Sequence, residues 1–192
     1  MDLPVVYIEK EPFLNMLLSA AETHKRECFG YIFGHKPTKE NNCFVVTNAA
    51  AVQLARKRKN KEIEQSRASR ARMREYFSRY STLYPMLGDF HSHPEWGDYV
   101  REMTLSDGDL EDMIKDNFLI GVVIKVVSVN KDRLLWQRAT HGGLKGSLGK
   151  FKFYVTVGRA IKGRGGKLHN ECLTIHAPAA IKALNRALGY GS

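Results

Sequence analysis

An almost continuous run of β-branched and other apolar residues, Leu119–Val129, constrains the fold of this chain more than any other feature. Asn117 and Asn130 bound the run at its two ends. A segment of this kind is typical of a strand that is covered on both faces of a sheet. The sequence therefore predicts a central buried strand over these residues.

Other strands and helices are predicted around this strand from turn residues and apolar spacing. Helices are expected over Glu11–His24, from Leu105 onward and from Pro178 onward. Strands are expected over Phe29–Phe33, Cys43–Thr47, Leu83–Ser92, Leu134–Ala139 and Phe151–Val157, and the glycine-rich stretch His141–Gly149 is interpreted as a turn or mobile loop. Helices interleaved with strands imply an α/β domain in which helices pack on a curved mixed β-sheet.

The length of the chain and its apolar content favour one domain. With 192 residues, 43% of them hydrophobic, the chain can bury one substantial core. We expect a single domain over 1–192, with a core over about 1–140 and a C-terminal strand and helix extension over 141–192. The chain has no apolar run long enough to span a membrane and no signal-peptide pattern, so a soluble, cytoplasmic protein with no membrane partner is expected.

The positive charge is concentrated in one segment. The chain has a net charge of +10, and residues 56–79 hold ten basic and three acidic side chains, or +7 of that total. No glycine or proline occurs from Ala55 to Leu83, which predicts a long exposed helix. We interpret the segment as an accessory surface for an acidic partner, and a polyanion or nucleic-acid partner is the alternative.

Two histidines and an aspartate have the order expected of a metal site. His91 and His93 are two residues apart at the end of a predicted strand, so both imidazoles project from one face, and Pro94 then ends the strand. Asp109 lies in the first turn of a predicted helix that Ser106 caps. Two imidazoles and a carboxylate would leave the fourth position of a tetrahedral zinc site open for water.

A carboxylate lies upstream of these residues. Glu27 precedes the glycine-punctuated strand Cys28–Gly34, which puts an acidic side chain at the mouth of an apolar strand. Cys28 itself is a conceivable nucleophile, but neighbouring residues on a strand point to opposite faces, so we expect its thiol to pack inward.

The sequence resembles the JAMM motif of MPN-domain zinc metalloproteases, and in particular the prokaryotic type. The resemblance rests on Glu27, on His-Ser-His-Pro at 91–94 and on Ser106 with Asp109, and it covers roughly Pro12 to Val129. It implies the MPN fold, which is similar to that of cytidine deaminases. It also implies that zinc binds to the two histidines and Asp109, with Glu27 as the general base and Ser106 as a stabiliser of the oxyanion.

This family includes deubiquitinating isopeptidases and their prokaryotic relatives. The resemblance implies hydrolysis of an amide or isopeptide bond at the C-terminus of a ubiquitin-like or sulfur-carrier-type protein. Twelve residues separate His93 from Ser106, more than the family commonly has, so the loop Glu95–Met103 is extended. Trp96 and Tyr99 in this loop are candidate substrate-binding residues, and packing of a longer surface connection is the alternative.

Two other function classes stay open. Many MPN domains have lost their metal ligands and act as scaffolds, whereas this chain retains all three ligands and Glu27. A polyanion-binding module that uses residues 56–79 is the second alternative.

Overall fold

The computed structural model describes residues 3–52, 55–59, 62–65, 67–79, 82, 85–94, 103–129 and 134–189. The helices are α1 (Lys10–Thr23), α2 (Arg67–Arg79), α3 (Asp107–Asp116) and α4 (Pro178–Ala187), with 3-10 turns at Thr140–Gly142 and Arg164–Gly166. The strands are β1 (Val5–Ile8), β2 (Phe29–His35), β3 (Cys43–Ala51), β4 (Ala55–Lys59), β5 (Glu62–Gln65), β6 (Met86–Pro94), β7 (Ile120–Ser128), β8 (Gln137–Arg138), β9 (Leu144–Leu148), β10 (Phe151–Lys162) and β11 (Leu168–His176).

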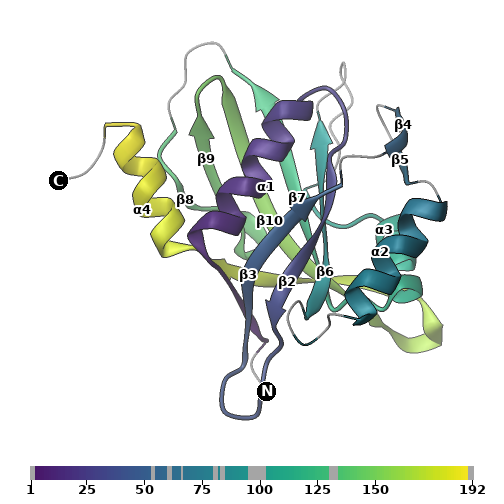
Figure 1. Ribbon diagram of the computed structural model, residues 1–192. Helices are drawn as coiled ribbons and strands as arrows, with labels where there is room; N and C mark the ends of the chain where they lie inside the picture. Colours follow the sequence, from purple (N-terminus) through teal and green to yellow (C-terminus); the bar gives the residue numbers. More distant parts are fainter. Residues whose placement is uncertain are drawn as a thin grey trace.

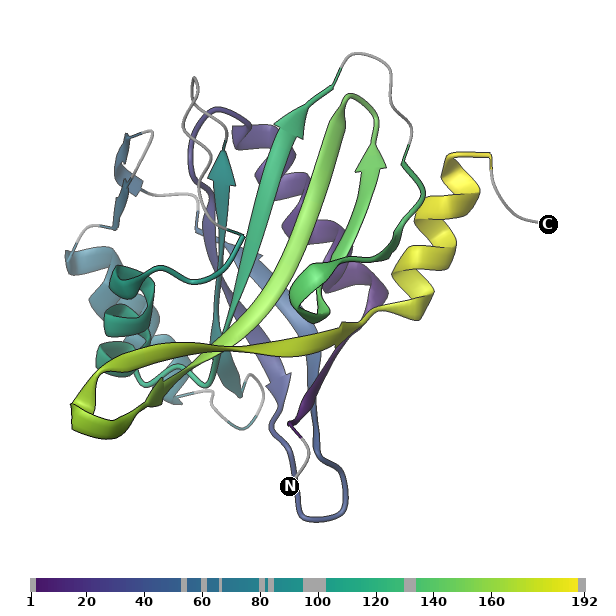
Figure 2. The ribbon, with the colours of Figure 1, turned by 180° about the vertical axis from the view of Figure 1, so that it is seen from behind.

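One mixed sheet organises these elements (Figures 1 and 2). Its strand order is β11-β1-β3-β2-β6-β7-β10-β9-β8, and β11 also pairs with the second half of β10. The mixed sheet with packed helices agrees with the expectation, but the additional pairing closes the strands from β11 round to β10 into a circuit, which the expected curved sheet did not include. The pairs β1–β3, β1–β11 and β6–β7 are parallel, and the others in this sheet are antiparallel.

The predicted central strand is confirmed as β7. It lies between β6 and β10, and its residues Ile120–Val126 are all buried. Lys125 is the only charged residue in this buried stretch. The strand is covered on one face by α1 and contacts α3 through Val123 on the other.

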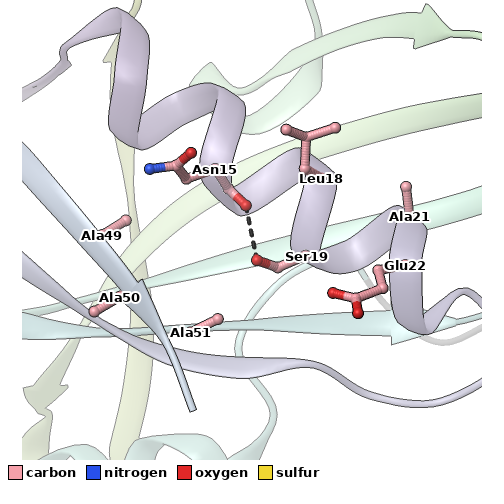
Figure 3. Close-up of a pocket in the computed structure, with 8 residues that line it drawn as sticks. All are labelled: Asn15, Leu18, Ser19, Ala21, Glu22, Ala49, Ala50 and Ala51. Carbon is pink, nitrogen blue, oxygen red and sulfur yellow. Dashed lines mark hydrogen bonds between the residues drawn. The ribbon is translucent and has the colours of Figure 1, made fainter. Parts of the chain in front are cut away.

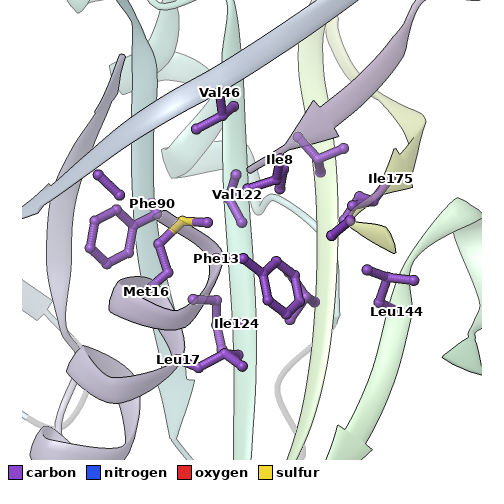
Figure 4. Packing of buried hydrophobic residues seen from close by; sticks show 14 of the residues in the cluster. Ile8, Phe13, Met16, Leu17, Val46, Phe90, Val122, Ile124, Leu144 and Ile175 are labelled. Atoms are coloured by element: carbon purple, nitrogen blue, oxygen red, sulfur yellow. The ribbon is translucent and has the colours of Figure 1, made fainter. Parts of the chain in front are cut away.

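Helix α1 fills the inner side of the curved sheet (Figure 4). Phe13, Met16, Leu17 and Ala20 recur at helical spacing and are almost fully buried in the main apolar core. Full burial of a large apolar side chain contributes about 1.5–3 kcal/mol, so this face of α1 holds the helix on the sheet. The predicted helix and the observed one agree within one residue at each end.

The C-terminal region joins the same core. Ala180 and Leu184 of α4 pack into it, and the Asn185 side chain is hydrogen-bonded to both the backbone N–H and the carbonyl of Trp136, at 2.8 and 3.2 Å. The helix predicted from Pro178 is confirmed. β10 and β11, from the region expected to be an extension, belong to the main sheet.

The basic segment was predicted wrongly as one long helix. It contains the antiparallel pair β4–β5 and then the separate helix α2. Like charges three or four residues apart repel one another along a helix, whereas the hairpin register pairs Lys57 with Glu64 and Lys59 with Glu62. These pairs of opposite charge in the hairpin register therefore favour two strands, rather than a helix, in the first half of the basic segment.

The glycine-rich stretch was also predicted wrongly, because it contains β9 between β8 and β10. A Cβ on Gly146 would lie 2.3 Å from Cδ2 of Trp136, so glycine lets the indole pack flat against the strand. The predicted strand Leu134–Ala139 shortens to β8, while the predicted strand Phe151–Val157 extends to Lys162 as β10. β1 and β11 were not predicted. None of the helices in the described part of the chain is long and apolar enough to cross a membrane.

Candidate metal centre

His91 and His93 lie on β6, on the face of the sheet opposite α1. Their rings are buried and their centroids are 5.0 Å apart. Phe90, which directly precedes His91 on the strand, points to the other face, into the core around α1. The period of two along a strand thus gives β6 an apolar face and an imidazole face, as the sequence predicted.

Asp109 is held in place by the start of α3. The backbone N–H and the hydroxyl of Ser106 both donate to Oδ2 of Asp109, at 2.7 and 2.6 Å, and the backbone N–H of Asp109 donates to the Ser106 hydroxyl at 3.4 Å. This is a reciprocal capping box, so the predicted cap is confirmed. Leu110 and Met113 of α3 pack on Val123 of β7, which docks the helix start beside the strand that carries the histidines.

These elements bring three potential ligands together. One ligand atom from each of His91, His93 and Asp109 lies within 4.8 Å of the others. Among the residues that the structure describes, Nε2 of His91 is buried without a hydrogen-bond partner, and it lies 3.5 Å from Oδ2 of Asp109. A cation between the three side chains would give this nitrogen a partner, and two imidazoles with one carboxylate suit zinc. The donor set therefore fits the metal that the sequence resemblance implies.

Asp89 is a further residue at this centre that the sequence did not single out. Its Oδ2 atom lies 3.6 Å from Nδ1 of His91, and its Oδ1 atom is buried without a hydrogen-bond partner in the described part of the chain. A carboxylate on the far nitrogen of a ligating imidazole fixes the orientation and the tautomer of the ring. Asp89, His91 and His93 share one face of β6, so strand periodicity was the signal that would have found it.

The electrostatics of the centre follow from these contacts. Burial by itself lowers the pKa of His91, but the carboxylates of Asp109 and Asp89 outweigh it and raise that pKa to about 10. For Asp109, burial acts to raise the pKa, and His91 and Ser106 reverse this and hold it well below its ordinary value. The carboxylates on the two sides of His91 thus favour a positive charge at this centre, which a bound metal cation would supply.

Glu27 reaches the same region from the start of β2. Phe29 is the register partner of His91, and two hydrogen bonds continue the pairing by one residue: the Cys28 N–H donates to the Ser92 hydroxyl at 2.8 Å, and the Ser92 N–H donates to the Cys28 carbonyl at 3.1 Å. The same register brings the backbone of Glu27 level with His93. Its side chain is 7% exposed.

The thiol beside Glu27 points the other way. Cys28 belongs to the core cluster around α1, as expected from strand alternation. Burial raises the pKa of its thiol to about 11, so at neutral pH it is protonated and a weak nucleophile.

The predicted substrate contacts are not tested by the structure. Trp96 and Tyr99 lie outside the described residues, so their role stays a prediction. A cavity of about 710 Å³ lies between α1 and β3 (Figure 3), on the face opposite the histidines. Its lining among the described residues is formed by alanines, by Leu18 and by polar side chains with Glu22 as the one carboxylate, so it offers no group of metal ligands.

Comparison with known proteins identifies the family. The family described as prokaryotic homologs of the JAB domain, Prok-JAB, matches residues 9–138, which is more than half of the chain. A JAB domain has the α/β fold of MPN domains, and the mixed sheet with its helices agrees with that class. None of the curated proteins compared with the chain matches it. The match spans Glu27, the two histidines, Ser106 and Asp109, and the chain therefore belongs to the Prok-JAB family.

Proposed function

We propose that this protein is a zinc-dependent metallohydrolase of the JAMM type. In this proposal it cleaves an amide or isopeptide bond at the C-terminus of a ubiquitin-like or sulfur-carrier-type protein. The observation that carries the proposal is the group formed by the buried His91 and His93 and the partly buried Asp109, in which Nε2 of His91 has no hydrogen-bond partner among the described residues. Zinc held by these three side chains would lower the pKa of water to about 7 and polarise the scissile carbonyl.

Glu27 supplies the proton transfers in this mechanism. Its carboxylate accepts a proton from the attacking water and returns it to the leaving nitrogen, so one group serves as base and then as acid. The hydrogen bonds between Cys28 and Ser92 hold the chain next to Glu27 against the strand that carries His93. Its low exposure keeps bulk water away from the carboxylate.

Ser106 has two roles that use different rotamers. Its hydroxyl now donates to Asp109, which orients that carboxylate. When it rotates away from Asp109, the same hydroxyl can donate to the oxyanion that develops on the substrate carbonyl. Its backbone N–H continues to hold Asp109, so the ligand stays in place during this rotation.

The scaffold alternative is disfavoured by the chain's own side chains. A non-catalytic domain has no need of two buried histidines and a partly buried aspartate, grouped as metal ligands, together with a buried Glu27. The segment from β4 to α2 is proposed to dock an acidic partner or the substrate protein, because residues 56–79 carry a net charge of +7.

The test is cleavage of matched fusions. Zinc-loaded protein is incubated with isopeptide-linked and linear ubiquitin-like fusions, and products are identified by mass spectrometry. We expect cleavage by the parent chain and a loss of about a hundredfold or more in Glu27→Gln, which retains its zinc. Equal cleavage by Glu27→Gln would refute the proposed base, and no cleavage of any fusion would refute the substrate class.

A further inference from the structure

A second hollow lies directly beside the candidate metal centre. It has a volume of about 430 Å³ and extends across β7 to β10, with its lining formed by Met103, Lys125, Val127, Val129, Lys152 and Tyr154. This volume is in the range of pockets that bind small ligands, roughly 300–1,000 Å³. We call this hollow the lysine pocket.

The sheet register places the lysine pocket next to the histidines. Lys125 of β7 is the partner of His93 on the adjacent parallel strand, and Tyr154 of β10 is the partner of Lys125 on the other side. Val127 and Lys152 form the next pair along the same face. Directly paired residues on neighbouring strands project from the same face of a sheet, about 5 Å apart. His93, Lys125 and Tyr154 therefore form one row.

Lys125 is the unusual residue in this row. It is 9% exposed, and among the residues that the structure describes it makes no hydrogen bond and no ion pair. A charged side chain that is this buried is costly unless a counter-charge accompanies it. The neighbouring acidic groups Asp89 and Asp109 are engaged with His91 instead. Lys125 thus lines the pocket with no acidic partner among the described residues, so an anion bound in the pocket would supply the counter-charge.

The other residues that line the lysine pocket are a second lysine, a tyrosine and three apolar side chains. The Lys152 ammonium lies 5.4 Å from the centroid of the Tyr154 ring, a cation–π distance that holds it at the pocket. Met103, Val127 and Val129 are apolar. The hydroxyl of Thr156 on β10 donates to the Met103 carbonyl, which anchors the Met103 rim to the sheet. The pocket therefore suits an anionic head on a short aliphatic stem.

We infer that the lysine pocket is a specificity subsite for a carboxylate of the substrate, close to the scissile bond. The inference rests on the proposed function, because it takes the neighbouring centre as the place of cleavage. The carboxylate is supplied either by an aspartate or glutamate side chain next to the scissile amide, or by the free C-terminus of a leaving residue. Salt bridging to Lys125 and Lys152 then fixes the position of the peptide relative to His93.

Binding to a protein that cannot turn over tests the subsite apart from catalysis. Zinc-loaded Glu27→Gln is titrated with peptides that contain Gly-Gly and carry glutamate or glutamine on either side of the target amide, each with a free or an amidated C-terminus. We expect the peptide with the recognised carboxylate to bind roughly tenfold or more tightly than its neutral partner, because hydrogen bonds to charged groups are strong. The glutamate and C-terminal arms separate the two sources of the carboxylate.

Matched lysine variants decide whether the pocket causes the preference. Lys125→Met, with and without Lys152→Gln, should abolish the ratio between charged and neutral peptides, and Lys125→Arg should restore part of it. Lys150→Gln removes the same charge from an exposed turn and should leave the ratio unchanged. Circular dichroism and zinc content establish that each variant is folded and loaded.

Two results would overturn the inference: no charge preference in any peptide arm, or a preference that survives loss of both lysines. The proposed function fails separately. If charged peptides bind through Lys125 but the parent chain cleaves none of them, the lysine pocket stands as a carboxylate-binding site and the proposed substrate class falls. If the parent cleaves charged and neutral peptides equally, the hydrolase stands and the subsite falls.

Discussion

The two faces of strand β6 carry side chains with different roles, one in packing and the other in binding. On the α1 side, Phe90 is fully packed in apolar surroundings, and the Ser92 hydroxyl accepts a backbone hydrogen bond. On the α3 side, a nitrogen of His91 and an oxygen of Asp89 are buried and have no hydrogen-bond partners within the described ranges. Unpartnered buried polar atoms lower the stability of the fold. The α1 side of β6, the inner face, therefore stabilises the fold, whereas the α3 side, the outer face, is suited to binding a ligand.

Truncation of Phe90 gives the largest expected change in stability. Phe90→Ala should lower the free energy of unfolding by about 3–5 kcal/mol, because it opens a cavity in the core. The loss should be the same with zinc and with a chelator. His93→Ala, by contrast, should abolish the increment that zinc adds to stability. Denaturant titrations with and without zinc measure both, and a Phe90→Ala protein that is stable but loses zinc would break the division between the faces.

Ser106→Ala should separate the two roles of that hydroxyl. Loss of a donor to the oxyanion typically lowers kcat by about a hundredfold, whereas loss of a helix cap costs only about 1 kcal/mol. We expect the large effect on kcat and the small one on the free energy of unfolding. Steady-state kinetics and thermal melts of the zinc-loaded variant provide the comparison. A full loss of stability with unchanged kcat per folded molecule would assign Ser106 to the cap alone.

Asp89→Asn probes the outer face without touching a ligand. The amide cannot hold the imidazole of His91 as a carboxylate does, so zinc affinity should fall by roughly tenfold or more. Competition with a chromogenic chelator measures the affinity, and the NMR signals of the ring nitrogens report the tautomer of His91. Unchanged affinity together with an unchanged tautomer would show that Asp89 does not position the ring.

The pH dependence of zinc binding should follow His91. Since the pKa of this residue is raised from its ordinary 6.5 to about 10, its protonated form stabilises the metal-free fold below pH 6.5, and that stabilisation is lost as the pH rises through 10. Zinc must displace this proton, so its apparent affinity should rise by up to roughly tenfold per pH unit below about pH 10. Chelator competition at several pH values checks the slope, and a flat profile would mean that His91 is neutral before zinc binds.

The features that could be predicted from the sequence are those set by local spacing of residues. The central strand, α1, α3 with its cap and the grouping of His91, His93 and Asp109 all follow from local spacing. The closing pair β10–β11 depends on partners that are distant along the chain, and local spacing carries no sign of it. Lys125 lies inside an apolar run and was not predicted as a site residue, because its position beside His93 depends on the register between two strands.

The zinc content of the purified protein tests directly whether His91, His93 and Asp109 bind a metal ion. The protein is purified without added metal, loaded with zinc, dialysed and measured by inductively coupled plasma mass spectrometry, in parallel with His91→Ala, His93→Ala and Asp109→Ala. We expect one zinc per chain in the parent and a loss of tightly bound zinc in each variant, all of which should fold. A parent chain that retains no zinc, or variants that retain it fully, would contradict the assignment of the metal to these three residues.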